Sequence, residues 1–157
     1  MSNTVVNAEA SGLPSFNLYG ELPPGIYRLS VDAFLGYFAC RSNRRLRLAR
    51  SFLRQAATLR SCGCKQLLAG GSFITSKSSP GDFDGAWNNE GVDENKLRRL
   101  EPRLLMEGPE DAESLAGESG GALVPWNPSA VGSPGFAEYL RYDDRTGRKK
   151  GLMLVEL

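Results

Sequence analysis

The stretch LAGGSFITSKSSPGDFDGAW, residues 68–87, is the part of the sequence that best predicts the fold. It opens with the end of an apolar run, KQLLAG at 65–70, which predicts a buried strand. A glycine pair and a serine follow, and they favour a tight turn because glycine adopts backbone conformations that other residues avoid. DFDGAW at 82–87 then alternates carboxylates with apolar residues, which is typical of a second strand.

Helical patterns lie on both sides of this stretch. Before it, Ser30 is a predicted cap for a short helix over VDAFLGYFA, and a longer helix is expected over residues 42–61. The apolar residues of the longer helix recur every three or four positions: Leu46, Ala49, Phe52, Leu53, Ala56 and Leu59. After it, Asp93 caps a predicted helix over DENKLRRL, and Pro102 opens a short helical piece.

The C-terminal third is predicted from weaker patterns. GPEDAESLAGESGG at 108–121 is small, acidic and glycine-rich, and we expect a loop there. ALVPW at 122–126 and GLMLVEL at 151–157 predict strands, and GFAEYLRYDD at 135–144 predicts a helix between them. The whole pattern indicates an α/β (α+β) fold, a small mixed sheet flanked by helices.

The length of 157 residues suits one domain. We expect residues 1–20 to form a flexible N-terminal arm and residues 21–157 to form the domain. The formal net charge of +1 names no class of partner. The chain shows no secretory signal and no apolar stretch of about 18 residues, so we expect a cytoplasmic protein without a membrane partner.

The chain contains no histidine, which excludes Ser-His-Asp and Cys-His catalysis and any histidine metal site. Cys62 and Cys64 are too close for the usual zinc spacing, so they and Cys40 are expected to be free thiols. Any chemistry must therefore use carboxylates, lysine, arginine or hydroxyl groups, with a metal held through oxygen.

Two aspartates form the candidate metal site. Asp82 and Asp84 are two residues apart on a predicted strand, so their side chains share a face, with α-carbons about 6–7 Å apart. Carboxylates that close repel each other unless a cation lies between them, and Mg²⁺ suits such a site. Gly71 and Ser72 would hold phosphates that the metal also binds, and Lys77 could reach a phosphate. The plainer alternative is a turn followed by a solvated strand end.

The helix over residues 42–61 is strongly basic. Seven arginines and no acid lie between Arg41 and Arg60. Arg47, Arg50 and Arg54 share one helix face. That face is either a solvated surface or a contact surface for phosphates or an acidic protein partner.

Gly71-Ser72, nine residues, then Asp82-Phe83-Asp84 is similar to the signature of the polymerase-beta-type nucleotidyltransferase superfamily. GSFITSKSSPGDFDGAW more closely resembles a family of small bacterial nucleotidyltransferase-like proteins of unknown function. The resemblance extends to LPPGIY, GCKQLLAGGSF, EGVD and GFAEYLRYDDRTGRKKGLMLVEL, so it covers most of the chain from about residue 22.

The resemblance implies a minimal nucleotidyltransferase fold and a magnesium-dependent transfer from a nucleoside triphosphate to a hydroxyl group. The acceptor would be a protein, an RNA or a small molecule. Asp82 and Asp84 would bind Mg²⁺ and serve as the catalytic carboxylates. Four residues would bind the nucleotide phosphates: Gly71, Ser72, Thr75 and Lys77.

One departure from the pattern bears on catalysis. Active members of the superfamily carry a third carboxylate on a following strand, where this chain has Ala122. Glu138 and Glu156 are the candidate substitutes. The resemblance therefore also allows a catalytically degenerate binding protein, and by analogy a component of a toxin–antitoxin or phage-defence pair.

Overall fold

The computed structural model describes residues 5–7, 12–128, 140, 142 and 146–157, and over this part of the chain the fold is α+β. Six strands form one mixed sheet in the order β1-β2-β6-β3-β4-β5. The strands are β1 (Val5–Asn7), β2 (Ile26–Ser30), β3 (Gln66–Gly70), β4 (Phe83–Asn88), β5 (Gly121–Trp126) and β6 (Leu152–Glu156). β3 runs antiparallel to both of its neighbours, β6 and β4, whereas the other neighbouring pairs are parallel.

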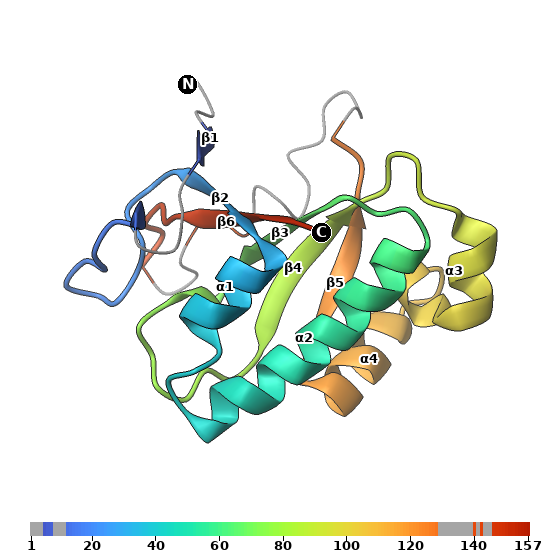
Figure 1. Cartoon of the computed structure of the whole chain (residues 1–157). Coiled ribbons are helices and arrows are strands. Elements are labelled where there is room, and N and C mark those ends of the chain that lie inside the picture. The colour runs from blue at the N-terminus through green and yellow to red at the C-terminus, as the bar shows by residue number, and fades with distance from the viewer. Residues whose placement is uncertain (1–4, 8–11, 129–139, 141, 143–145) are drawn as a thin grey trace.

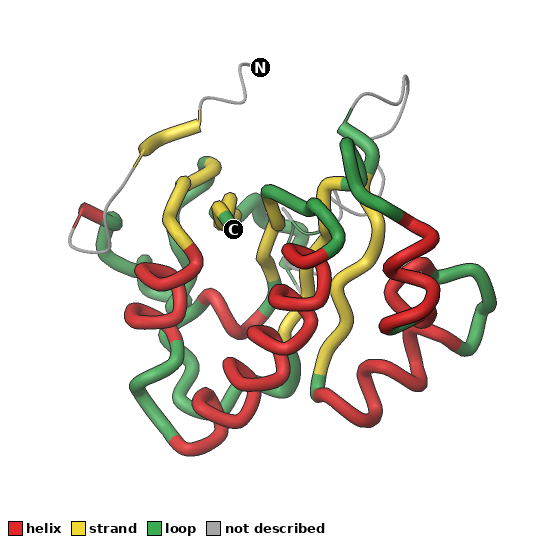
Figure 2. The backbone as a smooth tube through the Cα atoms, turned by 45° about the vertical axis from the view of Figure 1, so that its right-hand side comes forward, coloured by secondary structure: helices red, strands yellow, loops and turns green. Residues whose placement is uncertain are grey.

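The helices pack against this sheet (Figure 1). They are α1 (Val31–Phe38), α2 (Asn43–Ser61), α3 (Glu94–Leu100) and α4 (Asp111–Ser119), with short 3₁₀ turns η2 (Ser72–Ile74) and η3 (Pro102–Leu105). α1 and α2 lie side by side in front of the strands in Figure 1, and the turned view of Figure 2 keeps both on that same face. α3 and α4 lie beside the β5 end of the sheet.

The main core fills the space between the sheet and these helices. Phe34 of α1 and Phe52 of α2 have ring centroids 5.1 Å apart, and Phe52 also meets Phe83 of β4 at 5.5 Å. Trp87 is fully buried and donates its indole N–H to Leu104 O, which fixes η3 against β4. A second, smaller cluster of Leu68, Ala86 and Leu154 lies on the opposite face of the sheet.

Most of the predicted elements are confirmed, and the capping residues explain where the helices begin. The hydroxyl of Ser30 accepts a hydrogen bond from Ala33 N, and that of Ser42 accepts one from Arg45 N. The carboxylate of Asp93 caps α3 in the same way, by accepting from Lys96 N. The strands predicted around residues 65–70, 82–87, 122–126 and 151–157 correspond to β3, β4, β5 and β6. Cys40, Cys62 and Cys64 are free thiols.

The loop predicted over residues 108–121 is wrong, because Asp111–Ser119 is the helix α4. Leu115 is buried in the main core, and Gly120 ends the helix in the left-handed region at φ 78°. Arg103 of η3 also binds Glu118 of α4 at 2.7 Å. These tertiary contacts stabilise a segment whose composition alone favours a loop.

Two further strands were not predicted. β2 follows directly after the Pro-Gly turn at residues 23–25, and β1 pairs with it in parallel, although residues 1–20 were expected to form a flexible arm. The helix predicted over residues 135–144 falls almost entirely outside the described residues.

The apolar stripe of α2 is partly wrong. Leu46 and Leu53 are 40% and 44% exposed, whereas two polar side chains, Arg45 and Gln55, are buried. Gln55 donates to Gly121 O and accepts from Leu123 N, both at 3.0 Å. It therefore satisfies backbone groups of β5, the strand at one edge of the sheet.

Candidate functional site

The Gly-Ser turn lies directly beside the second aspartate. Gly70, the last residue of β3, is the register partner of Asp84 in β4. Gly71 has φ 74°, in the left-handed region, and a Cβ placed on it would lie 2.6 Å from Asp84 Oδ2. Position 71 therefore requires glycine for two reasons: the left-handed backbone conformation, and the Asp84 side chain, which occupies the space that a Cβ would take.

Ser72 and Asp82 meet at the same end of the sheet. The hydroxyl of Ser72 lies 3.5 Å from Asp82 O, where it donates a long hydrogen bond. Ser72 opens the single 3₁₀ turn η2. Asp82 stands one residue before β4 and is exposed, whereas Asp84 lies within the strand and is half-buried. Four predicted site residues, Gly71, Ser72, Asp82 and Asp84, are thus brought together.

A buried arginine holds the loop that connects the turn to the aspartates. Arg45 of α2 is fully buried and donates to three carbonyls of this loop: Phe73 O at 2.6 Å, Thr75 O at 2.6 Å, and Lys77 O at 2.6 and 2.9 Å. It also donates to Phe38 O at the end of α1. Burial, with a smaller contribution from Arg41, lowers the pKa of Arg45 to about 10, so it remains charged at neutral pH.

The first turn of α2 adds further contacts to this loop. Ser42 donates its hydroxyl to Ser78 O at 2.5 Å. Arg44 donates to Pro80 O at 3.1 Å and also to Gly81 O. Since Gly81 directly precedes Asp82, the chain between the turn and the aspartates is attached to α2 along most of its length.

Thr75 and Lys77, the other two predicted phosphate contacts, belong to the loop between the turn and the aspartates. The Thr75 hydroxyl donates to Ser72 O at 2.6 Å and accepts from Lys77 N at 3.2 Å, so it stabilises the local turn. Lys77 is exposed, and its main-chain carbonyl is held by Arg45. The roles predicted for these two residues stay predictions.

The position expected for a third carboxylate is occupied by a methyl group. Ala122 of β5 is the register partner of Asp84 in the neighbouring parallel strand. Glu156, a candidate substitute, is the register partner of Gln66 on β3, whereas Asp84 is the partner of Gly70, four residues further along that strand. Glu156 and Asp84 are therefore separated by about 13 Å along the strand direction. Glu156 binds Arg28 and Gln66. Glu138, the other candidate, lies outside the described residues.

Within the described part of the chain, Asp82 and Asp84 are the carboxylates that the structure brings to this turn. Among the described residues, no group of three or more His, Cys, Asp or Glu side chains is placed to hold a metal ion. Two carboxylates nevertheless suit Mg²⁺, which commonly takes one or two from a protein and completes its shell with water and substrate phosphates. The residues present fit a metal that arrives with a nucleotide.

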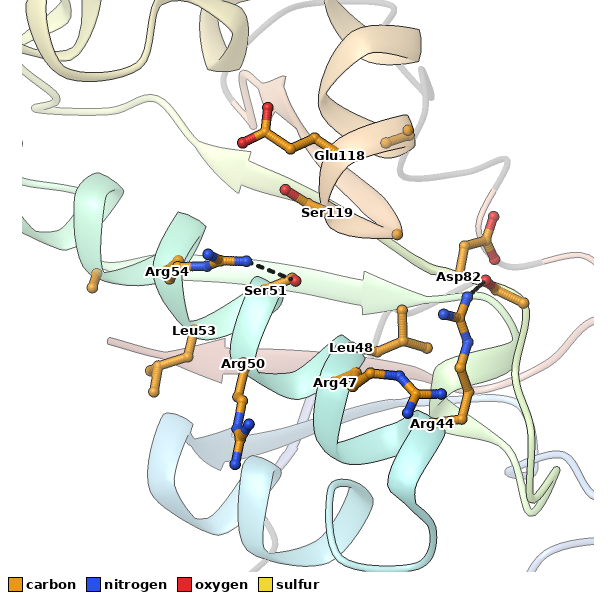
Figure 3. Close-up of a pocket in the computed structure, with 15 residues that line it drawn as sticks. Arg44, Arg47, Leu48, Arg50, Ser51, Leu53, Arg54, Asp82, Glu118 and Ser119 are labelled. Carbon is orange, nitrogen blue, oxygen red and sulfur yellow. Dashed lines mark hydrogen bonds between the residues drawn. The ribbon is translucent and has the colours of Figure 1, made fainter.

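The arginine face of α2 opens onto a groove beside Asp82 (Figure 3). The groove has a volume of about 1060 Å³ and lies between α2 and the C-terminal end of α4. Its lining includes Asp82 and all three arginines singled out in the sequence, Arg47, Arg50 and Arg54.

Sequence reasoning missed Arg44 and Arg45, which it treated only as part of a basic helix. The signal that could have found Arg45 is its place in the helical pattern. Position 45 lies three or four residues before two buried residues, Leu48 and Ala49, and therefore on the buried face. A charged residue there needs several acceptors, which the neighbouring loop carbonyls supply.

Comparison with known proteins identifies a family but no activity. The model of a family of unknown function, DUF6932, matches residues 14–156. The comparison with curated proteins found no match, and neither did the comparison with solved structures. In the part of the chain that the structure describes, none of the helices combines the length and apolar character that crossing a membrane requires.

Proposed function

We propose that this chain, which belongs to that family of unknown function, binds a magnesium–nucleoside triphosphate complex and transfers a nucleotidyl group to a hydroxyl acceptor. The observation that carries the proposal is the contact between the Gly-Ser turn and the aspartates. A Cβ on Gly71 would lie 2.6 Å from Asp84 Oδ2, and Ser72 lies against Asp82 O. A Gly-Ser turn beside two carboxylates can accept a phosphate and its metal together.

The roles of the residues follow from their chemistry. Asp82 and Asp84 would hold Mg²⁺, which would neutralise charge on the phosphates and on the leaving pyrophosphate. The Ser72 hydroxyl and the backbone next to Gly71 would orient the phosphates. In the transfer, the acceptor oxygen bonds to the α-phosphorus, the bond from that phosphorus to the bridging oxygen breaks, and pyrophosphate leaves. The hydroxyl proton passes to water.

Ala122 also favours a second candidate function, nucleotide binding without catalysis. If transfer needs a third carboxylate, a chain with Ala122 as the register partner of Asp84 would bind nucleotide without turning it over. Such a degenerate binding protein could serve in a toxin–antitoxin or phage-defence pair, which is an analogy with similar small proteins. The two candidates share the binding site and differ in whether pyrophosphate is released.

Calorimetric titration of ATP, GTP, CTP and UTP, with and without Mg²⁺, tests the shared site. We expect at least one of them to bind in the presence of Mg²⁺, and Asp84→Asn to abolish that binding while leaving the fold intact. Asp32→Asn is the matched control, because Asp32 is an exposed aspartate on α1 away from the turn. Absence of any magnesium-dependent binding to the wild-type chain would overturn both candidates. Pyrophosphate release would then separate the enzyme from the binding protein.

A further inference from the structure

The groove between α2 and α4 is a second feature, distinct from the Gly-Ser turn. α2 contributes four arginines to its lining, and the end of α4 contributes Gly117 and Gly120. Arg50 points away from α4 in Figure 3, which leaves Arg44, Arg47 and Arg54 along the groove. From Arg44 to Arg54 the helix advances about 15 Å. The glycines leave the α4 wall without side chains at two positions, so a chain-like ligand could lie along the arginines.

Positive charge in this groove is largely uncompensated. Helix α2 carries no acidic residue, and within the described part of the chain no ion pair involves Arg44, Arg47 or Arg54. Arg44 donates to carbonyls, and Arg54 donates to the Ser51 hydroxyl. Of the two acids in the lining, Glu118 binds Arg103, which leaves Asp82 at one end.

We propose that this groove binds a segment of single-stranded nucleic acid through its phosphate backbone. Guanidinium groups match phosphates in charge and geometry. Apolar side chains of α2, Leu48 and Leu53 among them, also line the groove, so it is the row of arginines that favours a phosphate ligand over an apolar protein partner. Leu48 is buried, and Leu53 points away from α4 in Figure 3. Nucleic-acid binding goes beyond the proposed nucleotidyl transfer and does not depend on it. A role for the bound strand as the hydroxyl acceptor, with its end near Asp82, rests on the proposed function.

Fluorescence anisotropy with a labelled single-stranded RNA of about 12 nucleotides tests the groove, and a DNA of the same sequence shows which sugar is preferred. We expect either probe to bind, with affinity falling as salt rises. Three arginine–phosphate contacts predict a slope of log K against log salt of about −2, since each contributes about −0.7 on a single strand. Failure of both probes to bind, or binding that is independent of salt, would overturn the proposal.

The variants Arg47→Ala and Arg54→Ala locate the binding. Both residues are exposed, so the fold should tolerate the changes. Each variant should weaken binding roughly fivefold and make the salt slope shallower by about 0.7. Arg60→Ala is the matched control, since Arg60 is an exposed arginine of the same helix outside the groove. Equal weakening by Arg60→Ala would mean that the attraction is nonspecific and would overturn the site.

Two further measurements separate this proposal from its rivals. A polyglutamate peptide should compete poorly with the nucleic acid; tighter binding of the peptide would assign the groove to an acidic protein partner and contradict the proposal. Asp84→Asn should leave nucleic-acid binding unchanged, because Asp84 does not line the groove. In the wild-type chain, nucleotide binding without RNA binding would overturn this proposal alone, and RNA binding without nucleotide binding would overturn the proposed function alone. Loss of RNA binding in Asp84→Asn would contradict a separate groove.

Discussion

The carboxylate of Asp84 lies where the side chain of residue 71 would begin: a Cβ on Gly71 would be 2.6 Å from Asp84 Oδ2. Gly71→Ala should therefore destabilise the fold by about 3 kcal/mol, from the left-handed backbone and the steric overlap together. It should also displace Asp84 and weaken magnesium-dependent nucleotide binding. Urea unfolding and calorimetric titration measure the two effects.

Gly91→Ala is the matched control for this prediction. Gly91 has φ 75°, almost the same as Gly71, but nothing lies within 4 Å of a Cβ placed on it. It should cost only the backbone part, about 1 kcal/mol. If the two variants lose equal stability, the overlap with Asp84 is not what fixes glycine at position 71.

Replacing Arg45 by methionine should destabilise the protein by about 3–5 kcal/mol, because two buried and two partly buried carbonyls lose their donor. Arg45→Lys should rescue little of this, since one ammonium group cannot reach carbonyls of Phe38, Phe73, Thr75 and Lys77 together. Urea unfolding gives the comparison. Arg60→Met, an exposed change on the same helix, should change stability by less than about 0.5 kcal/mol. Equal stability of Arg45→Met and wild type would contradict the assigned role.

Glu101→Gln should show a stability loss that depends on pH. Arg103 hydrogen-bonds both carboxylate oxygens of Glu101, at 2.7 and 2.8 Å, and holds the pKa of that carboxyl below its usual value. A carboxyl with a lowered pKa in the fold adds stability above its unfolded pKa of about 4.3, and this stability disappears as the pH falls through the folded pKa.

The variant should therefore be about 1 kcal/mol less stable than wild type at neutral pH and equal to it in strong acid. Urea unfolding as a function of pH measures the difference. Glu90→Gln is the control, because Glu90 is exposed and takes part in no ion pair among the described residues. A difference between Glu101→Gln and wild type that stays constant with pH would exclude an ionic contribution from this pair.

The sequence predicts the elements around the candidate site better than the contacts that hold them. Apolar runs and capping residues such as Ser30 and Asp93 depend on local chemistry, so the helices and strands that they mark are confirmed. Helix α4 could not be predicted in this way. It is stabilised by the burial of Leu115 and by the ion pair of Arg103 with Glu118, which only the folded chain brings together.

The same distinction applies within the site. The spacing of Gly71, Ser72, Asp82 and Asp84 predicts their proximity, because a turn between two adjacent strands brings their ends together. The attachment of the intervening loop to α2 through Arg45 joins residues about 30 positions apart, and no local pattern encodes it. Arginines on a helix are usually solvated, so charge alone gives no reason to expect a buried one.

Ala122→Asp is the variant that tests the missing carboxylate. Ala122 is the register partner of Asp84 in a parallel strand, so the new side chain should lie beside that of Asp84. Without metal, repulsion between the two carboxylates should lower stability by about 1–2 kcal/mol. Mg²⁺ should reverse this loss, and the rise in thermal unfolding temperature on adding Mg²⁺ should be several degrees larger than for wild type.

Two controls separate charge placement from other effects. Ala122→Asn adds the same volume without the charge and should show no magnesium-dependent rise. Val124→Asp adds the charge on the same face of β5 but two residues away, next to Ala86 rather than Asp84, and should not respond to Mg²⁺. If Ala122→Asp also raises pyrophosphate release from a bound nucleotide, the natural chain is a binding protein that lacks one catalytic ligand. A magnesium response equal to that of Ala122→Asn would mean that residue 122 does not face the metal, and the resemblance at this strand would fail.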